Sequence, residues 1–121
     1  MQNKIISNLD SLIENENPHF LLAVSGGIDS MVLLKFFQKN NESYKFSVAH
    51  VNHNYHSDAK NMEHLVQDQC AKMNNDLVVE NIFLKGVNSN IESSFRKMRY
   101  SKLEEIRKEI KADFILTAHH A

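Results

Sequence analysis

The 121-residue sequence contains a single cysteine, and it lacks several other features that would place it in a special class of proteins. One cysteine excludes an intramolecular disulfide and a metal cluster held by cysteines of this chain. No segment approaches the ~20 apolar residues of a membrane-spanning helix, and the N-terminus has no apolar signal-peptide segment. Fourteen basic and fifteen acidic residues leave a formal charge of −1, so no basic field indicates nucleic acid by itself. We therefore expect one ordinary globular domain in a reducing, cytoplasmic setting, with no membrane partner.

The cysteine, Cys70, stands at helical spacing from three apolar residues, Met62, Val66 and Met73. Such spacing is typical of one face of an amphipathic helix. A free cysteine on an apolar face is usually a small core residue and not a reactive group. The sequence therefore predicts that this thiol is buried in the core.

Apolar patterns divide the chain into alternating helices and strands. A helix is expected over residues 2–15, where apolar residues recur at helical spacing until Asn15, Asn17 and Pro18 end it. The predicted strands cover residues 20–24, 45–51, 76–84 and 114–117. Of the predicted helices between them, the first carries Asp29 and Ser30 in its first turn, the second is capped by Ser57 or Asp58, and the third begins at Ile91. Alternating strands and helices predict an α/β, Rossmann-like fold with a parallel sheet, right-handed crossovers and helices on both faces.

The segment Ser25-Gly26-Gly27-Ile28-Asp29-Ser30 joins the first strand to the helix that follows it. Adjacent glycines let the backbone turn with no Cβ in the way, so several N–H groups can point at one anion. The start of the helix adds unpaired donors and a partial positive charge. A Walker loop is excluded, because no Lys-Ser or Lys-Thr pair follows a G-x-x-x-x-G pattern. We expect a phosphate loop in which a β-branched residue at either glycine abolishes binding, because such residues resist positive φ and crowd the anion.

Ligands of parallel sheets bind beyond the carboxyl ends of the strands, and three further segments are predicted there, at residues 50–53, 85–90 and 118–121. His50-Val51-Asn52-His53 ends the second strand, and its side chains either contact a nucleotide or anchor the loop. Thr117-Ala118-His119-His120-Ala121 ends the fourth strand. Adjacent residues of a strand face opposite sides, so contact of one histidine with a substrate is favoured over a metal site built from the pair.

The long helix predicted from Ile91 to Lys111 carries two arginines, Arg96 and Arg99, on one flank. Two guanidinium groups on one flank can grip a single anion. The alternative is a solvated face with intrahelical ion pairs, such as one between Glu92 and Arg96. Charge pattern alone favours the solvated face.

The glycine loop resembles the S-G-G-x-D-S pyrophosphate loop of the ATP pyrophosphatases, the PP-loop superfamily, which split ATP between its α and β phosphates. With His50–His53, Asn90–Tyr100 and Thr117–Ala121, it resembles the tRNA(Ile)-lysidine synthetase family. The resemblance implies an adenine nucleotide alpha hydrolase-like fold, with residues 1–121 as the N-terminal part of the catalytic domain, truncated near the fourth strand. The end of that domain and the C-terminal tRNA-binding domains would then be absent. The sequence departs from the family at Asn54-Tyr55-His56, where Gly-Leu-Arg is common.

The resemblance also implies a ligase that joins lysine to the wobble cytidine in the CAU anticodon of an isoleucine tRNA. ATP, with Mg²⁺, would adenylate the 2-carbonyl oxygen of the cytosine, and free L-lysine would then displace AMP to give lysidine. Most contacts to the tRNA would lie outside this chain, which by itself is expected to be inactive. Asp29 would lie near Mg²⁺ and the phosphates, and Arg96, Arg99 and His120 would lie around the activated cytidine. The implied nucleotide-binding residues are Ser25, Gly26, Gly27, Ile28, Asp29, Ser30, Val51 and His53.

Three other classes of protein would carry the same glycine loop and are alternatives to a lysidine synthetase. A tRNA thiolase activates a base in the same way, but such enzymes generally need two or more cysteines or a cysteine-bound cluster, and this chain has only Cys70. An amide-forming synthetase for a small metabolite would release pyrophosphate in response to a small acid and not to tRNA. A non-enzymatic module would bind the nucleotide without turnover.

Overall fold

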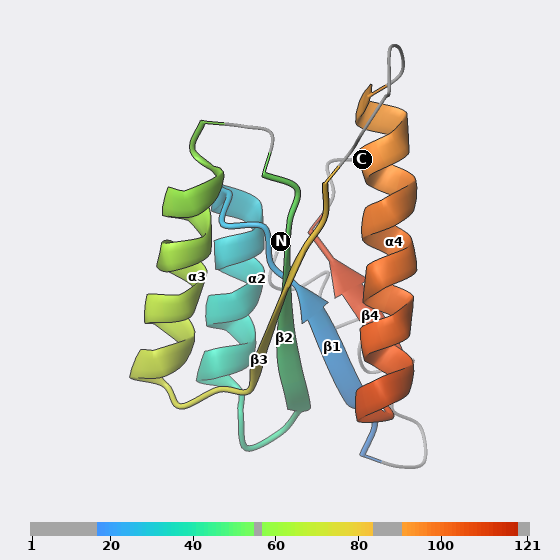
Figure 1. The fold of residues 1–121 in the computed structure, drawn as a ribbon. Coiled ribbons are helices and arrows are strands. Elements are labelled where there is room, and N and C mark those ends of the chain that lie inside the picture. Colours follow the sequence, from blue (N-terminus) through green and yellow to red (C-terminus); the bar gives the residue numbers. More distant parts are fainter. Residues whose placement is uncertain (1–16, 55–56, 84–90, 119–121) are drawn as a thin grey trace.

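The computed structural model describes residues 17–54, 57–83 and 91–118, and the helix expected over residues 2–15 lies outside them. Strands and helices alternate along the described chain (Figure 1). Each strand and helix predicted within the described residues is present. The elements are β1 (His19–Ala23), α2 (Ile28–Lys39), β2 (Lys45–Asn52), α3 (Ala59–Lys72), β3 (Leu77–Asn81), α4 (Ile91–Ile110) and β4 (Phe114–Thr117).

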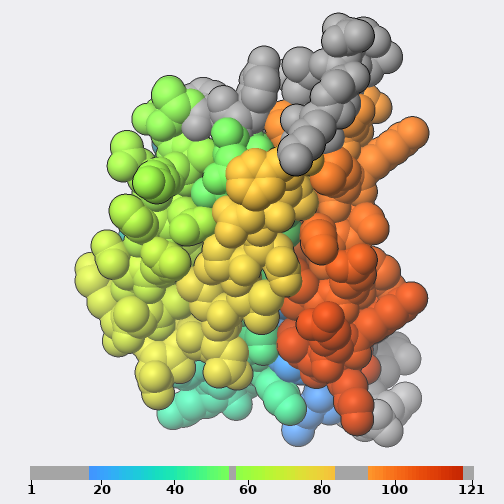
Figure 2. All heavy atoms as spheres, in the orientation of Figure 1, coloured from blue at the N-terminus to red at the C-terminus, as the bar shows by residue number. Residues whose placement is uncertain are grey.

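The four strands form one parallel sheet in the order β3-β2-β1-β4. Helices α2 and α3 cover one face and α4 covers the other (Figure 1). The space-filling view from the β3 edge shows these three layers, with β3 in yellow between the green and orange helices (Figure 2). This confirms the predicted α/β fold with helices on both faces. After β3 the chain crosses to the other face through α4 and returns as β4 on the far side of β1, so the strand order reverses between β1 and β4.

Strand β3 is shorter than the predicted strand over residues 76–84. Its ladder with β2 runs from the pair Val48–Leu77 to the pair Asn52–Asn81. Strand β2 ends at Asn52, and β3 is an edge strand of the described sheet with no partner strand on its other side. The Ile82 N–H still donates to the Asn52 carbonyl oxygen over 2.8 Å, and β3 ends where its neighbour ends.

The sheet is buried on both faces, which explains why β1 is a continuous apolar run. Phe20, Leu22 and Val24 point into a core beneath α2 and α3. Leu21 and Ala23 point into a second core beneath α4. The first core is rich in aromatic rings, and Phe20 packs edge-on against Phe37 with ring centroids 5.6 Å apart.

The prediction that the Cys70 thiol is buried is confirmed. Cys70 is 2% exposed beside the fully buried Val66, and burial raises the pKa of its thiol to about 11. Met73 is 43% exposed, because α3 ends at Lys72 and the helical periodicity stops one residue too early. Asp58 occupies the predicted N-cap position, but its side chain makes no capping hydrogen bond. No helix within the described part of the chain has both the length and the apolar surface needed to cross a bilayer.

At the opposite end of the sheet, His19 ties β1 to its neighbours on both sides. Its Nε2 lies 2.8 Å from Ser47 Oγ of β2, and its backbone N–H donates to Asp113 Oδ2 over 2.8 Å. The pKa of His19 is lowered from its usual value of 6.5, chiefly by burial and then by Lys45, while Asp113 and Asp76 oppose the shift. The neutral imidazole is therefore the form that suits the folded chain.

This histidine should make folding stability depend on pH. Because the unfolded chain binds the proton more tightly, the contribution of His19 is fully present above the unfolded pKa, near 6.5, and is lost as the pH falls through the lowered folded pKa. Urea unfolding followed between pH 7.5 and 5 should show this loss, and His19→Gln should reduce it. His64→Gln, at an exposed position of α3, is the matched control and should leave the pH profile unchanged. Equal profiles for the wild type and His19→Gln would contradict the assignment.

Candidate functional site

A cavity of about 260 Å³ lies at the carboxyl ends of β1 and β2, at the edge where ligands of parallel sheets bind. Its walls come from the glycine loop, the end of β2, the first half of α3 and the middle of α4. The lining residues are Ala23, Val24, Ser25, Ala49, His50, Val51, Asn52, His53, Ala59, Met62, Arg99 and Leu103. The cavity thus joins three of the segments singled out in the sequence: the glycine loop, the end of the second strand and the arginine helix.

The glycine loop is organised by the hydroxyl group of Ser30, which is 5% exposed. Ser30 Oγ donates to the Gly27 carbonyl oxygen over 2.9 Å. It also accepts from the backbone N–H groups of Ser25 at 3.1 Å and Gly26 at 3.0 Å. Two of the amides expected to face an anion are therefore directed at an oxygen of the protein. Ser30 holds the shape of the loop from within.

The two glycines have different physical roles. Gly26 has φ +93°, and a Cβ there would lie 2.8 Å from Met62 Cβ and 3.0 Å from the Met62 carbonyl oxygen. Gly27 has φ −74° and ψ 166°, and a Cβ there would meet only Ser25 Oγ, at 3.5 Å. The expectation that both positions need positive φ is therefore wrong for Gly27. Gly26 is required by its conformation and by the close approach of α3.

Helix α2 begins at Ile28, with Asp29 and Ser30 in its first turn as predicted. Its first backbone hydrogen bond runs from the Met31 N–H to the Gly27 carbonyl oxygen over 3.0 Å. The amides of the preceding turn stand before the hydrogen-bond ladder, at the positive end of the helix dipole, where an anion is favoured. The Ile28 side chain is 84% exposed.

At the end of β2 the structure shows an anchoring contact, whereas contact with a nucleotide stays a prediction. His50 is 3% exposed, and its Nδ1 lies 2.7 Å from the Val24 carbonyl oxygen, so it anchors the end of β1. Val51 and His53 line the cavity. The His53 ring also packs on the Phe95 ring of α4, with centroids 5.0 Å apart.

Asn52 and Asn54 fix the turn that follows β2. The Asn52 amide donates to Glu63 Oε1 of α3 over 3.0 Å, and its Oδ1 accepts the Asn54 backbone N–H over 2.8 Å. Asn54 has φ +59°, a left-handed conformation that asparagine tolerates better than most residues. This explains how asparagine can occupy position 54, where the family that the sequence resembles commonly has glycine. Tyr55 and His56 lie outside the described residues.

The structure separates the two arginines of α4. Arg99 is half-buried and lines the cavity. Arg96 is exposed and does not line it, and its guanidinium carbon lies 5.8 Å from the centroid of the Tyr100 ring. A shared grip on one anion inside the cavity is therefore not formed in this arrangement.

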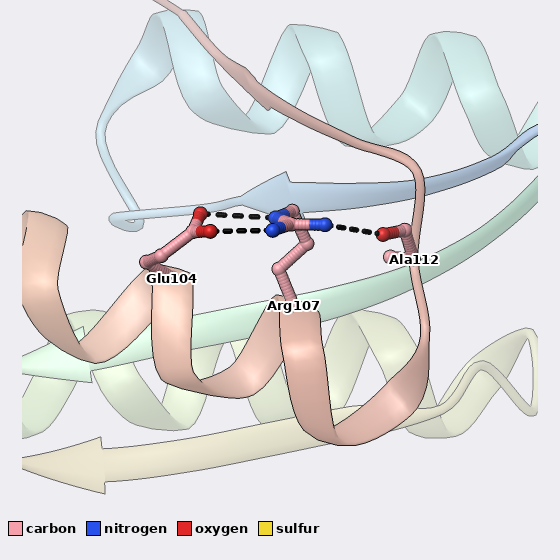
Figure 3. A network of polar contacts seen from close by, with 3 residues as sticks. All are labelled: Glu104, Arg107 and Ala112. Carbon is pink, nitrogen blue, oxygen red and sulfur yellow. Dashed lines mark hydrogen bonds and ion pairs between the residues drawn. The ribbon is translucent and has the colours of Figure 1, made fainter.

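Ion pairing on α4 is concentrated in its second half. Both oxygens of Glu104 accept hydrogen bonds from Arg107, which also donates to the Ala112 carbonyl oxygen over 3.0 Å (Figure 3). The hydrogen bonds from Arg107 lower the pKa of Glu104. Lys102 pairs with Glu105 at 3.4 Å. The two ion pairs among the described side chains lie in this half, and the predicted pair between Glu92 and Arg96 lies outside the described side chains.

Two predicted site residues, His120 and Asp29, are not among the described residues that line the cavity. His120 lies outside the described residues. Within residues 17–54, 57–83 and 91–118, no group of three or more His, Cys, Asp or Glu side chains is placed to hold a metal ion. Asp29 is therefore a single carboxylate beside the loop. Sequence reasoning missed Ala59, Met62 and Leu103 as lining residues, because an apolar residue on a helix carries no signal that separates a cavity wall from the core.

Comparison with curated proteins gives relatives among the tRNA(Ile)-lysidine synthases. The chain is 36% identical over 116 residues to the protein of Thermosipho africanus (strain TCF52B), covering 91% of this chain and 27% of the relative. It is 37% identical over 100 residues to that of Mycoplasmopsis pulmonis (strain UAB CTIP), covering 83% and 34%. It is 33% identical over 117 residues to that of Petrotoga mobilis (strain DSM 10674 / SJ95), covering 92% and 38%. The chain thus spans less than two-fifths of each relative.

Two solved structures share the fold. The U34-tRNA thiolase NcsA from Methanococcus maripaludis superimposes with a TM-score of 0.86 at 17% identity, covering 98% of this chain and 43% of that one. The NH3-dependent NAD synthetase from Campylobacter jejuni superimposes with a TM-score of 0.70 at 15% identity, covering 98% and 55%. At these identities the likeness concerns the fold alone. The PP-loop domain matches residues 1–121. The chain therefore belongs to the PP-loop domain family.

Proposed function

We propose that residues 1–121 are the N-terminal part of the catalytic domain of a tRNA(Ile)-lysidine synthetase. The observation that carries the proposal is the cavity in which the glycine loop, the end of β2 and Arg99 meet. The identity of 33–37% to three lysidine synthases supports the choice of reaction within the PP-loop family. The end of the domain and the tRNA-binding domains would lie in the parts of those relatives that this chain does not cover.

The loop fits the phosphates of ATP in three respects. The first turn of α2 offers backbone donors and the positive end of a helix dipole. Ser25 lines the cavity from the loop side. Neither the backbone conformation nor the packing at position 27 requires glycine. We interpret the absence of a side chain there as room for a phosphate group. Ser25–Ser30 would hold the phosphates, and Val51 and His53 would contact the nucleoside.

Asp29 suits Mg²⁺, because this ion is usually held by one or two carboxylates together with phosphate oxygens and water. When bound, Mg²⁺ would neutralise charge that develops on the departing pyrophosphate. Asp29 would hold the ion beside the loop, and the helix amides would stabilise the same charge from the other side. The cofactor set of this proposal is ATP with Mg²⁺.

In the proposed reaction, the 2-carbonyl oxygen of the wobble cytidine attacks the α-phosphorus of ATP, and the bond to pyrophosphate breaks. A carbonyl oxygen is a poor leaving group, and its link to AMP makes it a good one. The amine of free L-lysine then attacks the ring carbon that carries this oxygen, the carbon–oxygen bond breaks, and AMP leaves. Arg99 would stabilise the charge on the cytidine oxygen or the α-phosphate, with Arg96 and His120 proposed around the base.

The tRNA would approach along the first half of α4. The described side chains from Ser93 to Tyr100 include three basic residues, Arg96, Lys97 and Arg99, and no acidic one. A local basic stretch on a chain with a net charge of −1 suits the phosphates of the anticodon loop, while the body of an isoleucine tRNA would be bound elsewhere. A cytoplasmic location follows from this substrate.

A sulfur-transfer reaction is less well supported. Cys70 is the only cysteine of the chain, is 2% exposed in the core, and has its pKa raised to about 11. Only the thiolate is a nucleophile or a metal ligand, and a thiol with such a pKa stays protonated near neutral pH. The chain therefore offers no group of its own that could carry or deliver sulfur.

The test is the substrate dependence of pyrophosphate release by the complete protein that contains residues 1–121. We expect pyrophosphate release from ATP to require an isoleucine tRNA with a CAU anticodon but not to require lysine. Incorporation of labelled lysine should require both ATP and this tRNA. The matched control is the same tRNA with uridine at the wobble position, which should support neither step. Residues 1–121 alone should not form lysidine. Pyrophosphate release that follows a small carboxylic acid without tRNA would instead indicate an amide-forming synthetase, and ATP binding with no turnover would indicate a binding module.

A further inference from the structure

A backbone carbonyl group sets the tautomer of the buried His50. The His50 Nδ1 lies 2.7 Å from the Val24 carbonyl oxygen, and both groups are buried at the carboxyl end of the sheet. A carbonyl oxygen can only accept a hydrogen bond, so the imidazole must donate from Nδ1. In the neutral ring, the opposite nitrogen, Nε2, then carries a lone pair and no proton.

That lone pair is available at the cavity. His50 is a lining residue, and no side chain or backbone group among the described residues bonds its Nε2. No side-chain nitrogen or oxygen of the described residues is both sealed from solvent and without a partner. The Nε2 atom therefore reaches the cavity space, and a ring that is 3% exposed presents its only accessible polar atom there.

We propose that His50 Nε2 accepts a hydrogen bond from the nucleoside part of the bound nucleotide, either from its exocyclic amine or from a ribose hydroxyl. This inference rests on the proposed function, in which the cavity holds ATP. An acceptor lone pair attracts an N–H or O–H group and repels a phosphate oxygen. His50 therefore gives the cavity a direction, with the phosphates at the loop and α2 and the nucleoside over the end of β2.

Two substitutions separate this role from the anchoring of Val24. His50→Asn keeps an amide N–H near the position of Nδ1 and removes the acceptor at Nε2. We expect the midpoint of thermal unfolding to stay close to that of the wild type and the affinity for ATP–Mg²⁺, measured by isothermal titration, to fall by about 3- to 10-fold. His50→Gln reaches the position of Nε2 with its side-chain oxygen and loses the bond to Val24. It should lower the unfolding midpoint and retain more of the affinity than His50→Asn.

Nucleotide analogues identify the donor and work on the wild-type protein even if a variant fails to fold. Inosine triphosphate lacks the amine, and 2′-deoxy-ATP and 3′-deoxy-ATP each lack one hydroxyl. One of these analogues should bind the wild type about 3- to 10-fold more weakly than ATP, and that difference should vanish in His50→Asn. Wild-type affinities that are equal for all four nucleotides would overturn the proposal. So would an equal loss of affinity for inorganic pyrophosphate in His50→Asn, because His50 would then face the phosphates. A wild-type protein that does not bind ATP would refute the proposed function itself, whereas normal ATP binding by a folded His50→Asn would refute this inference alone.

Discussion

Gly26→Ala should destabilise the chain by about 2–5 kcal/mol, because two independent penalties meet at this residue. A side chain at φ +93° enters a backbone region that costs about 1–2 kcal/mol for most residues. Its Cβ would also lie 2.8 Å from Met62 Cβ and 3.0 Å from the Met62 carbonyl oxygen, and such overpacking typically costs about 1–3 kcal/mol. Since one of these atoms belongs to the backbone of α3, the clash is relieved only if the helix moves. Urea unfolding of the wild type and the variant measures the difference directly.

Gly27→Ala is the matched control for this prediction, because it changes the neighbouring residue of the same loop. The backbone at Gly27 is extended and its nearest atom is in ordinary contact range, so alanine should leave stability unchanged or raise it by about 0.4–1 kcal/mol. Any loss of ATP affinity in Gly27→Ala or Gly27→Val must then come from the ligand side. Unchanged ATP affinity in a folded Gly27→Val would remove the phosphate assignment of the loop, and equal stability of both alanine variants would contradict the role given to Gly26.

Arg99→Ala should slow tRNA-dependent AMP formation in the complete protein by about 10²–10³, which corresponds to about 2.7–4 kcal/mol for one lost contact to the transition state. Affinity for ATP should stay nearly intact, since the contact is proposed to form as charge develops on the cytidine oxygen or the α-phosphate. Arg99→Lys should recover only part of the rate, because lysine offers a point charge and not a planar fork. Single-turnover measurements with saturating ATP separate this chemical step from binding.

Arg96→Ala is the comparison that the structure supplies, because Arg96 is proposed near the base but lies outside the cavity. Arg96 lies three residues from Arg99 on the same helix and carries the same charge, but it is exposed and does not line the cavity. A general loss of positive charge would affect both variants alike, whereas a contact inside the cavity would make Arg99→Ala much the more severe. Near-normal turnover in Arg99→Ala would return the first half of α4 to a solvated face without a catalytic role.

The order of elements and the place of the site could be predicted from the sequence because both depend on local patterns. The apolar runs of β1 and β2, the helical spacing in α3 and α4, and the glycine loop between strand and helix are properties of neighbouring residues. Strands that alternate with helices impose a parallel sheet, and a parallel sheet collects its loops at one edge. The position of the cavity follows from these rules before any contact is known.

The tertiary structure decided which residue of each motif performs which task, because that depends on distances between segments far apart in the chain. Met62 of α3 makes glycine necessary at position 26 and leaves position 27 free. The Val24 carbonyl oxygen sets the tautomer of His50, although 26 residues separate them. Arg96 and Arg99 share one flank of α4, but only Arg99 lies where the cavity meets the helix. Local patterns determine which groups are present, and only long-range packing determines where their atoms point.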